Sequence, residues 1–357
     1  MVSTLNTSSN CSNMDDTVMQ TSTSAIRVGL SGCGGGLESV PMQQLLTTAV
    51  EAERLGFDAL WINEEHFQGN VCDVDGVGRI CLSPVVLASA ILARTTRIRV
   101  GFSVLVLPTH NPIRLAEEIA ALDQLSGGRV DVGLSRGHPR YLQIFAPNYL
   151  NEDFFSSMNT LTQAWRGETL SISDHEIVVT PGPFQKPHPP IYIGTYSEDL
   201  MDWIVSEGYQ IICHGITSID KLRSLMSAFV RAGGNPVNVP LGRFVYVSES
   251  DTLAKDEIWP TILNLTARLR KIGIDKRGII SSELLEPSRF LHEVAIVGSA
   301  DSCAEKLASL MRDTGSRYLN LLSSFFAYRP QSKLHKSLRL FATVVAPQLA
   351  LEFTESK

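Results

Sequence analysis

Residues 97–137, RIRVGFSVLVLPTHNPIRLAEEIAALDQLSGGRVDVGLSRG, contain the pattern that decides the fold of this chain. Apolar runs rich in Val, Ile and Leu occupy 98–107 and 129–134, and a segment with helical periodicity joins them. Neither run alternates strictly between apolar and polar residues, which is typical of strands buried on both faces of a parallel sheet. The stretch therefore predicts a strand–helix–strand unit whose two strands run parallel.

The joining helix has clear boundary signals. Asn111 is a favoured N-cap residue, Pro112 suits the first helical position, and Gly127 suits the end of a helix. A period of 3.6 residues gives this helix one apolar face, which we expect to be buried. The residues expected on that face are Leu115, Ile119, Leu122 and Leu125.

The same alternation of strands and helices continues in both directions along the chain. The segments predicted to be strands are 25–30, 58–62, 98–107, 129–134, 190–195, 209–214, 243–247 and 317–322. Eight β/α units in one α/β chain predict a TIM (β/α)8 barrel. The alternative is an open doubly wound sheet, but residues 32–37, GCGGGL, do not match the GxGxxG dinucleotide fingerprint.

Two connections are longer than a barrel needs, so we expect insertions after strands 4 and 7. They span 138–188 and 248–300, and long connections in compact domains are often functional. The second is polar and weakly periodic over 267–287, which favours a mobile lid. Residues 1–24 are rich in Ser, Thr and Asn and predict a disordered tail, which leaves 25–357 as one barrel domain.

Composition and charge exclude several classes of partner. The net charge of −6 and the absence of any Lys/Arg block argue against binding to nucleic acid or an anionic membrane. The apolar runs are shorter than a membrane span, and the first residues lack the basic start and apolar core of a signal peptide. The 6 cysteines are scattered without a CxxC pair, which favours free thiols in the cytoplasm and no zinc site.

Polar side chains follow several of the predicted strands, where TIM barrels carry their chemistry. In WINEEHF, residues 61–67, two carboxylates and an imidazole follow a buried run: Glu64, Glu65 and His66. They form an acid/base cluster at the mouth of a pocket, a solvated strand end, or a metal site. Adjacent residues on a strand point to opposite faces, and no second His/Asp cluster completes a metal shell. We therefore predict no metal.

Arg136 and Ser197 follow two other strands and together suggest a phosphate site. Ser197 precedes a predicted helix, whose positive end attracts anions, and the guanidinium of Arg136 can bind a phosphate with two hydrogen bonds. Taken singly, Arg136 fits a surface salt bridge and Ser197 fits a plain N-cap. Their coincidence at one end of the barrel favours a phosphorylated ligand.

At this point the sequence resembles the bacterial luciferase-like flavin-dependent monooxygenases. The resemblance covers nearly the whole chain except the tail, and its blocks include EAERLGFDALWINEEHF, the opening stretch 97–137, and PPIYIGTYSEDLMDWIVSEGYQII. It implies a barrel that binds reduced FMN, often supplied by a separate flavin reductase, and that reacts with O2 through a C4a-peroxyflavin to oxidise a small organic substrate. It also implies a homodimer, or a heterodimer with a related subunit. A branch of the superfamily uses the deazaflavin F420 instead.

The resemblance also assigns site residues by position. Arg136 corresponds to an arginine near the flavin phosphate, and Ser135 to a residue near the reactive edge of the isoalloxazine. Ser103–Val104 corresponds to a non-proline cis peptide under the flavin in several members. The residues expected to contact the cofactor are Asn63, Glu64, Ser103, Val104, Ser135, Arg136, Gly137, His138, Tyr196, Ser197 and His214.

The sequence departs from luciferase at two positions. Glu65 stands where that enzyme has its proposed catalytic histidine, and Leu200 replaces a hydroxyl residue near the phosphate. We expect Glu65 and His66 to be the catalytic acid/base residues, and the departure argues against aldehyde oxidation of the luciferase kind. The alternatives are an F420-dependent hydride-transfer enzyme, and a flavin-binding protein or partner subunit without activity.

Overall fold

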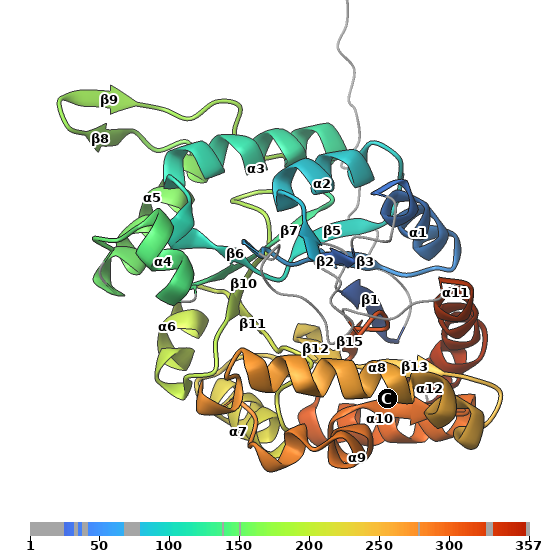
Figure 1. Ribbon diagram of the computed structural model, residues 1–357. Coiled ribbons are helices and arrows are strands. Elements are labelled where there is room, and N and C mark those ends of the chain that lie inside the picture. The colour runs from blue at the N-terminus through green and yellow to red at the C-terminus, as the bar shows by residue number, and fades with distance from the viewer. Residues whose placement is uncertain are drawn as a thin grey trace, which may run out of the picture.

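Eight parallel strands form the centre of the molecule (Figure 1). The computed structural model describes residues 25–31, 35–37, 42–67, 79–137, 139–149, 151–277, 279–325 and 331–354, so the predicted tail lies outside the described residues. The strands are β1 (Arg27–Ser31), β3 (Ala59–Ile62), β5 (Arg99–Phe102), β7 (Val130–Ser135), β10 (Ile191–Gly194), β11 (Gln210–Ile212), β12 (Pro240–Arg243) and β15 (Tyr318–Leu321).

These strands close on themselves into a barrel. Their order is β11-β10-β7-β5-β3-β1-β15-β12, and every pairing along it is parallel. Cys213, just after β11, bridges to Leu241 of β12: its N–H donates to Pro240 O at 3.2 Å, and its carbonyl accepts from Gly242 N–H at 2.8 Å. The predicted (β/α)8 barrel is confirmed.

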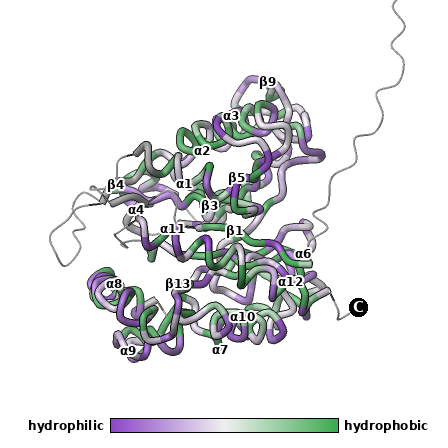
Figure 2. Tube along the Cα trace, turned by 90° about the vertical axis from the view of Figure 1, so that its right-hand side faces the viewer, coloured by the Kyte–Doolittle hydropathy of each residue, from purple (hydrophilic) through white to green (hydrophobic). Residues whose placement is uncertain are grey.

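Helices surround the barrel and follow the strands in sequence. They are α1 (Met42–Arg54), α2 (Pro84–Leu92), α3 (Pro112–Ser126), α5 (Asn151–Arg166), α6 (Met201–Ser206), α7 (Ile219–Arg231), α10 (Ala300–Thr314), α11 (Gln331–Leu340) and α12 (Ala346–Thr354). Hydrophilic and hydrophobic residues are mixed along the outer helices (Figure 2), as expected for helices that bury one face against a barrel.

Helix α3 begins and ends where the sequence predicts. The side chain of Asn111 accepts hydrogen bonds from the N–H groups of Ile113 and Arg114, and Gly127 ends the helix in the left-handed conformation, with φ 67°. The predicted buried face is correct except for Leu125, which is 86% exposed. Leu125 lies in the last turn at the edge of the apolar stripe, so α3 turns it away from the barrel.

Trp61 fills the centre of the barrel. Gly29 and Gly101 have no side chain where the indole lies, and a Cβ at Gly29 would stand 2.9 Å from it. The indole Nε1–H donates to the Tyr318 hydroxyl at 2.9 Å, and the Tyr192 ring packs edge-on with 5.1 Å between ring centroids. The barrel is therefore a packed core below the strand ends, not a channel.

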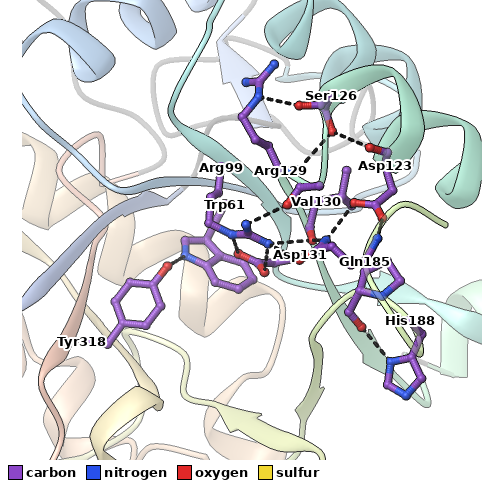
Figure 3. Close-up of polar contacts among 12 residues, drawn as sticks. Trp61, Arg99, Asp123, Ser126, Arg129, Val130, Asp131, Gln185, His188 and Tyr318 are labelled. Atoms are coloured by element: carbon purple, nitrogen blue, oxygen red, sulfur yellow. Dashed lines mark hydrogen bonds and ion pairs between the residues drawn. The ribbon is translucent and has the colours of Figure 1, made fainter. Parts of the chain in front are cut away.

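A polar network connects the barrel to the extended segment before β10 (Figure 3). Arg99 pairs with Asp131 at 2.7 Å and donates to the side chain of Gln185 at 3.0 Å. Gln185 in turn donates to Asp123 of α3 at 2.7 Å. Asp131 is buried, and the partly exposed Arg99 pairs with it through two hydrogen bonds, which is the condition under which a buried carboxylate is tolerated.

The two long connections contain extra elements. After β7 come α4 (Pro139–Phe145), α5, and the hairpin of β8 (Leu170–Ile172) and β9 (His175–Ile177), which projects from the body in Figure 1. After β12 come β13 (Val245–Val247), α8 (Asp251–Lys271), α9 (Pro287–Arg289) and β14 (Ile296–Gly298) before α10.

The described residues of 267–287 pack as short helical elements, and the mobility predicted for this segment stays a prediction. Its first residues belong to helix α8, and the side chains of Leu269, Ile280 and Leu285 are buried. These apolar side chains are spaced irregularly because short 3-10 turns follow α8, so the segment shows little periodicity although it packs against the core.

The seventh predicted strand, 243–247, is misplaced by a few residues. The barrel strand is β12, Pro240–Arg243, whereas Val245–Val247 leaves the barrel and pairs with β14. Pro240 and Gly242 weaken the strand signal of β12, and a Cβ at Gly242 would overlap the backbone of the turn after β11. Within the described residues, no helix is long and apolar enough to cross a membrane, and no group of His, Cys, Asp and Glu could hold a metal ion.

Candidate active site

A cavity of about 390 Å³ opens at the C-terminal ends of β5, β7, β10 and β11. The predicted residues that line it are Ser103, Val104, Ser135, Arg136, Gly137, Tyr196, Ser197 and His214. The lining residues that were not predicted as contacts are Phe154, Ile193, Gly194, Thr195, Leu200 and Ile212. The strand-end rule therefore brings most of the predicted residues to one site.

The floor of the cavity is the segment after β5. The peptide bond between Ser103 and Val104 is cis, as predicted. The Val104 side chain packs onto the Trp61 cluster at the top of the barrel core. Gly194 makes room for it, since a Cβ there would lie 2.9 Å from Val104 Cγ1. The aromatic core thus supports the floor from below.

Arg136, directly after β7, also lines the cavity. Its guanidinium carbon lies 5.0 Å from the ring centroid of Phe155 and 5.6 Å from that of Phe154. Its Nε is buried and has no hydrogen-bond partner among the residues that the structure describes. A buried donor without a partner is costly, so this arrangement suits an anionic or polar ligand.

Ser197 opens the turn after β10 and also lines the cavity. Its hydroxyl accepts from Asp199 N–H at 3.3 Å and donates to the Asp199 carboxylate at 3.2 Å, and its own N–H donates to Thr195 Oγ1 at 3.0 Å. The turn continues as a 3-10 helix over Glu198–Leu200 and then as α6. The helix predicted after Ser197 therefore begins with a tighter turn than the sequence suggests.

His214, after β11, is held in one tautomer. Its Nδ1 accepts a hydrogen bond from Ile216 N–H at 3.2 Å, so the proton of the neutral ring is on Nε2. Burial, with a smaller effect from the charge of Arg243, lowers the pKa of His214 to about 4. The imidazole is therefore neutral at pH 7.

The residues of WINEEHF lie beside the cavity and are not part of its lining. Glu64 is buried, whereas Glu65 and His66 are partly exposed. Burial would by itself raise the pKa of Glu64, but hydrogen bonds from His110, His66 and Val106 N–H outweigh it and lower the pKa to about 2. Glu64 is thus an ionised carboxylate bonded to protein groups.

His66 lies between Glu64 and helix α4. Its Nε2 is 2.9 Å from Glu64 Oε1, and its backbone N–H donates to the Tyr141 hydroxyl at 3.2 Å. The rings of Tyr141 and Phe145 approach the imidazole with centroid distances of 5.1 and 4.8 Å. The predicted acid/base residues therefore belong to a loop that α4 covers with aromatic side chains.

His110 and Phe154 were not among the predicted site residues, and His138 lies outside the described residues. His110 follows the third predicted strand in PTHNP, so the strand-end rule could have found it. Phe154 is on α5, and only its buried position in the folded chain brings it to the cavity.

A family model and a related sequence both point to the same protein family. The family model of luciferase-like monooxygenases matches residues 24–318. The alkanal monooxygenase alpha chain of the Kryptophanaron alfredi symbiont is 24% identical over 341 residues, which is 86% of this chain and 93% of that one.

Solved structures share the fold over most of the chain. The oxygenating constituent of 3,6-diketocamphane monooxygenase from Pseudomonas putida, in complex with FMN, is 19% identical, with a TM-score of 0.73 over 90% of this chain and 98% of that one. The F420-dependent tetrahydromethanopterin reductase of Methanopyrus kandleri is 14% identical, with a TM-score of 0.65 over 91% and 99%.

Proposed function

This chain belongs to the luciferase-like monooxygenase family, and we propose that it oxidises a small organic substrate with reduced FMN and O2. The observation that carries the proposal is the cavity itself. It combines a cis Ser103–Val104 floor over an aromatic core with a buried Nε on Arg136 that has no hydrogen-bond partner among the described residues. A largely apolar surface and a cation are features that an isoalloxazine ring and its phosphate require.

The cavity residues fit FMN in chemical type. Arg136 would bind the phosphate together with the Ser197 turn, and Tyr196 would lie beside them. Ser103, Val104 and Ser135 would contact the ring system, and His214 would present a neutral donor to it. FMN bound in this way would supply the electrons that activate O2.

The protein's own contribution would be exclusion of water and control of protons. The apolar side chains that line the cavity, Val104 among them, would keep water away from the bound ring. Glu65 and His66 would transfer the proton that substrate oxidation requires, since they follow β3 at the strand ends and carry acid/base groups. Glu65→Gln and His66→Gln should then slow substrate oxidation while FMN binding is retained. Normal turnover in both variants would show that neither side chain transfers this proton.

We also propose that a separate flavin reductase supplies the reduced FMN. The chain would form a dimer with a second copy of itself or with a related subunit. The distinguishing experiment is titration of the purified protein with FMNH2 and with reduced F420, each with and without O2. Tight binding of FMNH2, and its oxidation by O2 at a rate that differs from that of free FMNH2, support the proposal. Binding of F420 alone, with hydride transfer in the absence of O2, would replace it. FMNH2 binding without any oxidation chemistry would favour a non-catalytic flavin-binding protein.

A further inference from the structure

Glu64 is the most heavily bonded carboxylate beside the cavity. Its side chain is only 2% exposed. Oε2 accepts from Val106 N–H at 2.5 Å, and Oε1 lies 2.9 Å from the Nε2 atoms of both His66 and His110. The Thr109 hydroxyl is 3.4 Å from Oε1. One carboxylate thus organises groups from two loops, far beyond what a solvated strand end needs.

The first consequence concerns the cavity floor. The backbone N–H of Glu64 faces Val104 O at 3.4 Å, and its carboxylate accepts from Val106 N–H. Both contacts fall on the segment directly after the cis Ser103–Val104 bond, and Val104 is part of the cavity floor. Glu64 therefore holds the chain on the C-terminal side of the floor at two points.

The second consequence concerns the two histidines. An ionised carboxylate can only accept hydrogen bonds, so an imidazole nitrogen that faces it must carry a proton. His66 and His110 both approach Glu64 through Nε2. In their neutral forms both rings must therefore carry the proton on Nε2, and Nδ1 is the basic nitrogen of each. Asp and Glu orient catalytic histidines by the same principle.

We propose that Glu64 is a positioning residue with two tasks: its carboxylate fixes the cavity floor through Val106 and fixes His66 and His110 in the Nε2–H tautomer. Nδ1 is then the basic nitrogen of His66, and His110 is a further member of the site. The part that concerns flavin rests on the proposed function, whereas the tautomers can be tested without any ligand.

Charge balance agrees with this arrangement. The groups that face the Glu64 carboxylate are the two imidazoles, Val106 N–H and the Thr109 hydroxyl, and Tyr141 contacts His66 from α4. A buried carboxylate is tolerated only when donors surround it, and removal of one donor leaves it undersatisfied. Glutamine cannot replace it, because an amide offers one acceptor oxygen where the two imidazoles and Val106 N–H all donate.

The test is ¹⁵N NMR of the histidine rings in the ligand-free protein, with signals assigned through His66→Gln and His110→Gln. We expect protonated Nε2 and unprotonated Nδ1 for both residues in the parent protein. In Glu64→Gln, at least one ring should turn to the Nδ1–H tautomer so that Nε2 can accept from the amide. Glu53→Gln is the matched control, because Glu53 also accepts backbone N–H bonds, from Arg97 and Ile98 at 2.7 and 2.9 Å, away from the cavity.

FMN affinity, from fluorescence quenching, tests the floor. Glu64→Gln should weaken binding by roughly tenfold or more, the effect expected from loss of a charged hydrogen bond, and Glu53→Gln should leave it unchanged. If Glu64→Gln does not fold, His110→Gln, which keeps a donor, should preserve FMN affinity and His110→Leu should reduce it. Nδ1–H tautomers in the parent, or histidine signals and affinity that the Glu64 and His110 variants do not move, overturn the inference. Failure of the parent protein to bind FMN at all would instead contradict the proposed function.

Discussion

The indole Nε1–H of Trp61 donates to the hydroxyl of Tyr318 at 2.9 Å in the middle of the barrel, where both side chains are fully buried. This contact joins β3 to β15, and the same indole supports Val104 in the cavity floor. The stability of the barrel and the shape of the cavity therefore depend on one aromatic cluster.

Trp61→Phe should lower the free energy of unfolding by about 1–3 kcal/mol, because it removes the partner of a buried hydroxyl and leaves space in the core. Urea unfolding followed by circular dichroism measures the change. Leu351→Ala, at a position 66% exposed, should shift the value by no more than about 0.5 kcal/mol. Equal stability of the two variants would show that the barrel core repacks freely around position 61.

Gly101→Ala should destabilise the protein through overpacking. An added Cβ would overlap the Trp61 ring, and the ring cannot move aside because its neighbours are closely packed. We expect a loss of about 1–3 kcal/mol, or failure to fold. Gly182→Ala is the matched control, since the nearest atom to its added Cβ is the flexible Lys186 Nζ at 3.4 Å. Thermal unfolding of both variants distinguishes a crowded barrel from a general effect of alanine.

Arg136→Ala should weaken FMN binding roughly tenfold to a hundredfold, because a guanidinium that binds phosphate is lost. Arg114→Ala, on the exposed side of α3, serves as the control for a lost positive charge. Fluorescence quenching of FMN gives both dissociation constants. If the two variants bind FMN equally well, the phosphate is not at Arg136, and the orientation assigned to the cofactor is wrong.

Acid should remove a stabilising contribution of Glu64. Its pKa is lowered from 4.5 to about 2 in the folded chain, so the ionised carboxylate stabilises the fold above pH 4.5, and this is lost as the pH falls towards 2. The full contribution is about 3 kcal/mol. The stability difference between the parent and Glu64→Gln should therefore narrow as the pH is lowered through this window. Glu176→Gln, on the exposed hairpin strand β9, should give a curve parallel to that of the parent.

The sequence by itself determined the barrel and most of the cavity. Continuous apolar runs, capping residues such as Asn111 and the regular alternation of strands and helices depend on local chemistry, so they are visible without coordinates. The strand-end rule placed Ser135, Arg136 and Ser197 together because the carboxyl ends of parallel strands in a closed barrel meet on one face. The prediction of strands from apolar runs missed the start of β12, because Pro240 and Gly242 interrupt the apolar run there.

The role of Glu64 was decided only by the tertiary structure. Its hydrogen-bond partners Val106 and His110 lie 42 and 46 residues away, and no periodicity or motif connects them to WINEEHF. Whether a strand-end carboxylate faces solvent, a ligand or protein donors depends on which loops fold over it, and that is a property of packing. The same holds for Trp61, whose place in the barrel depends on glycines in two other strands.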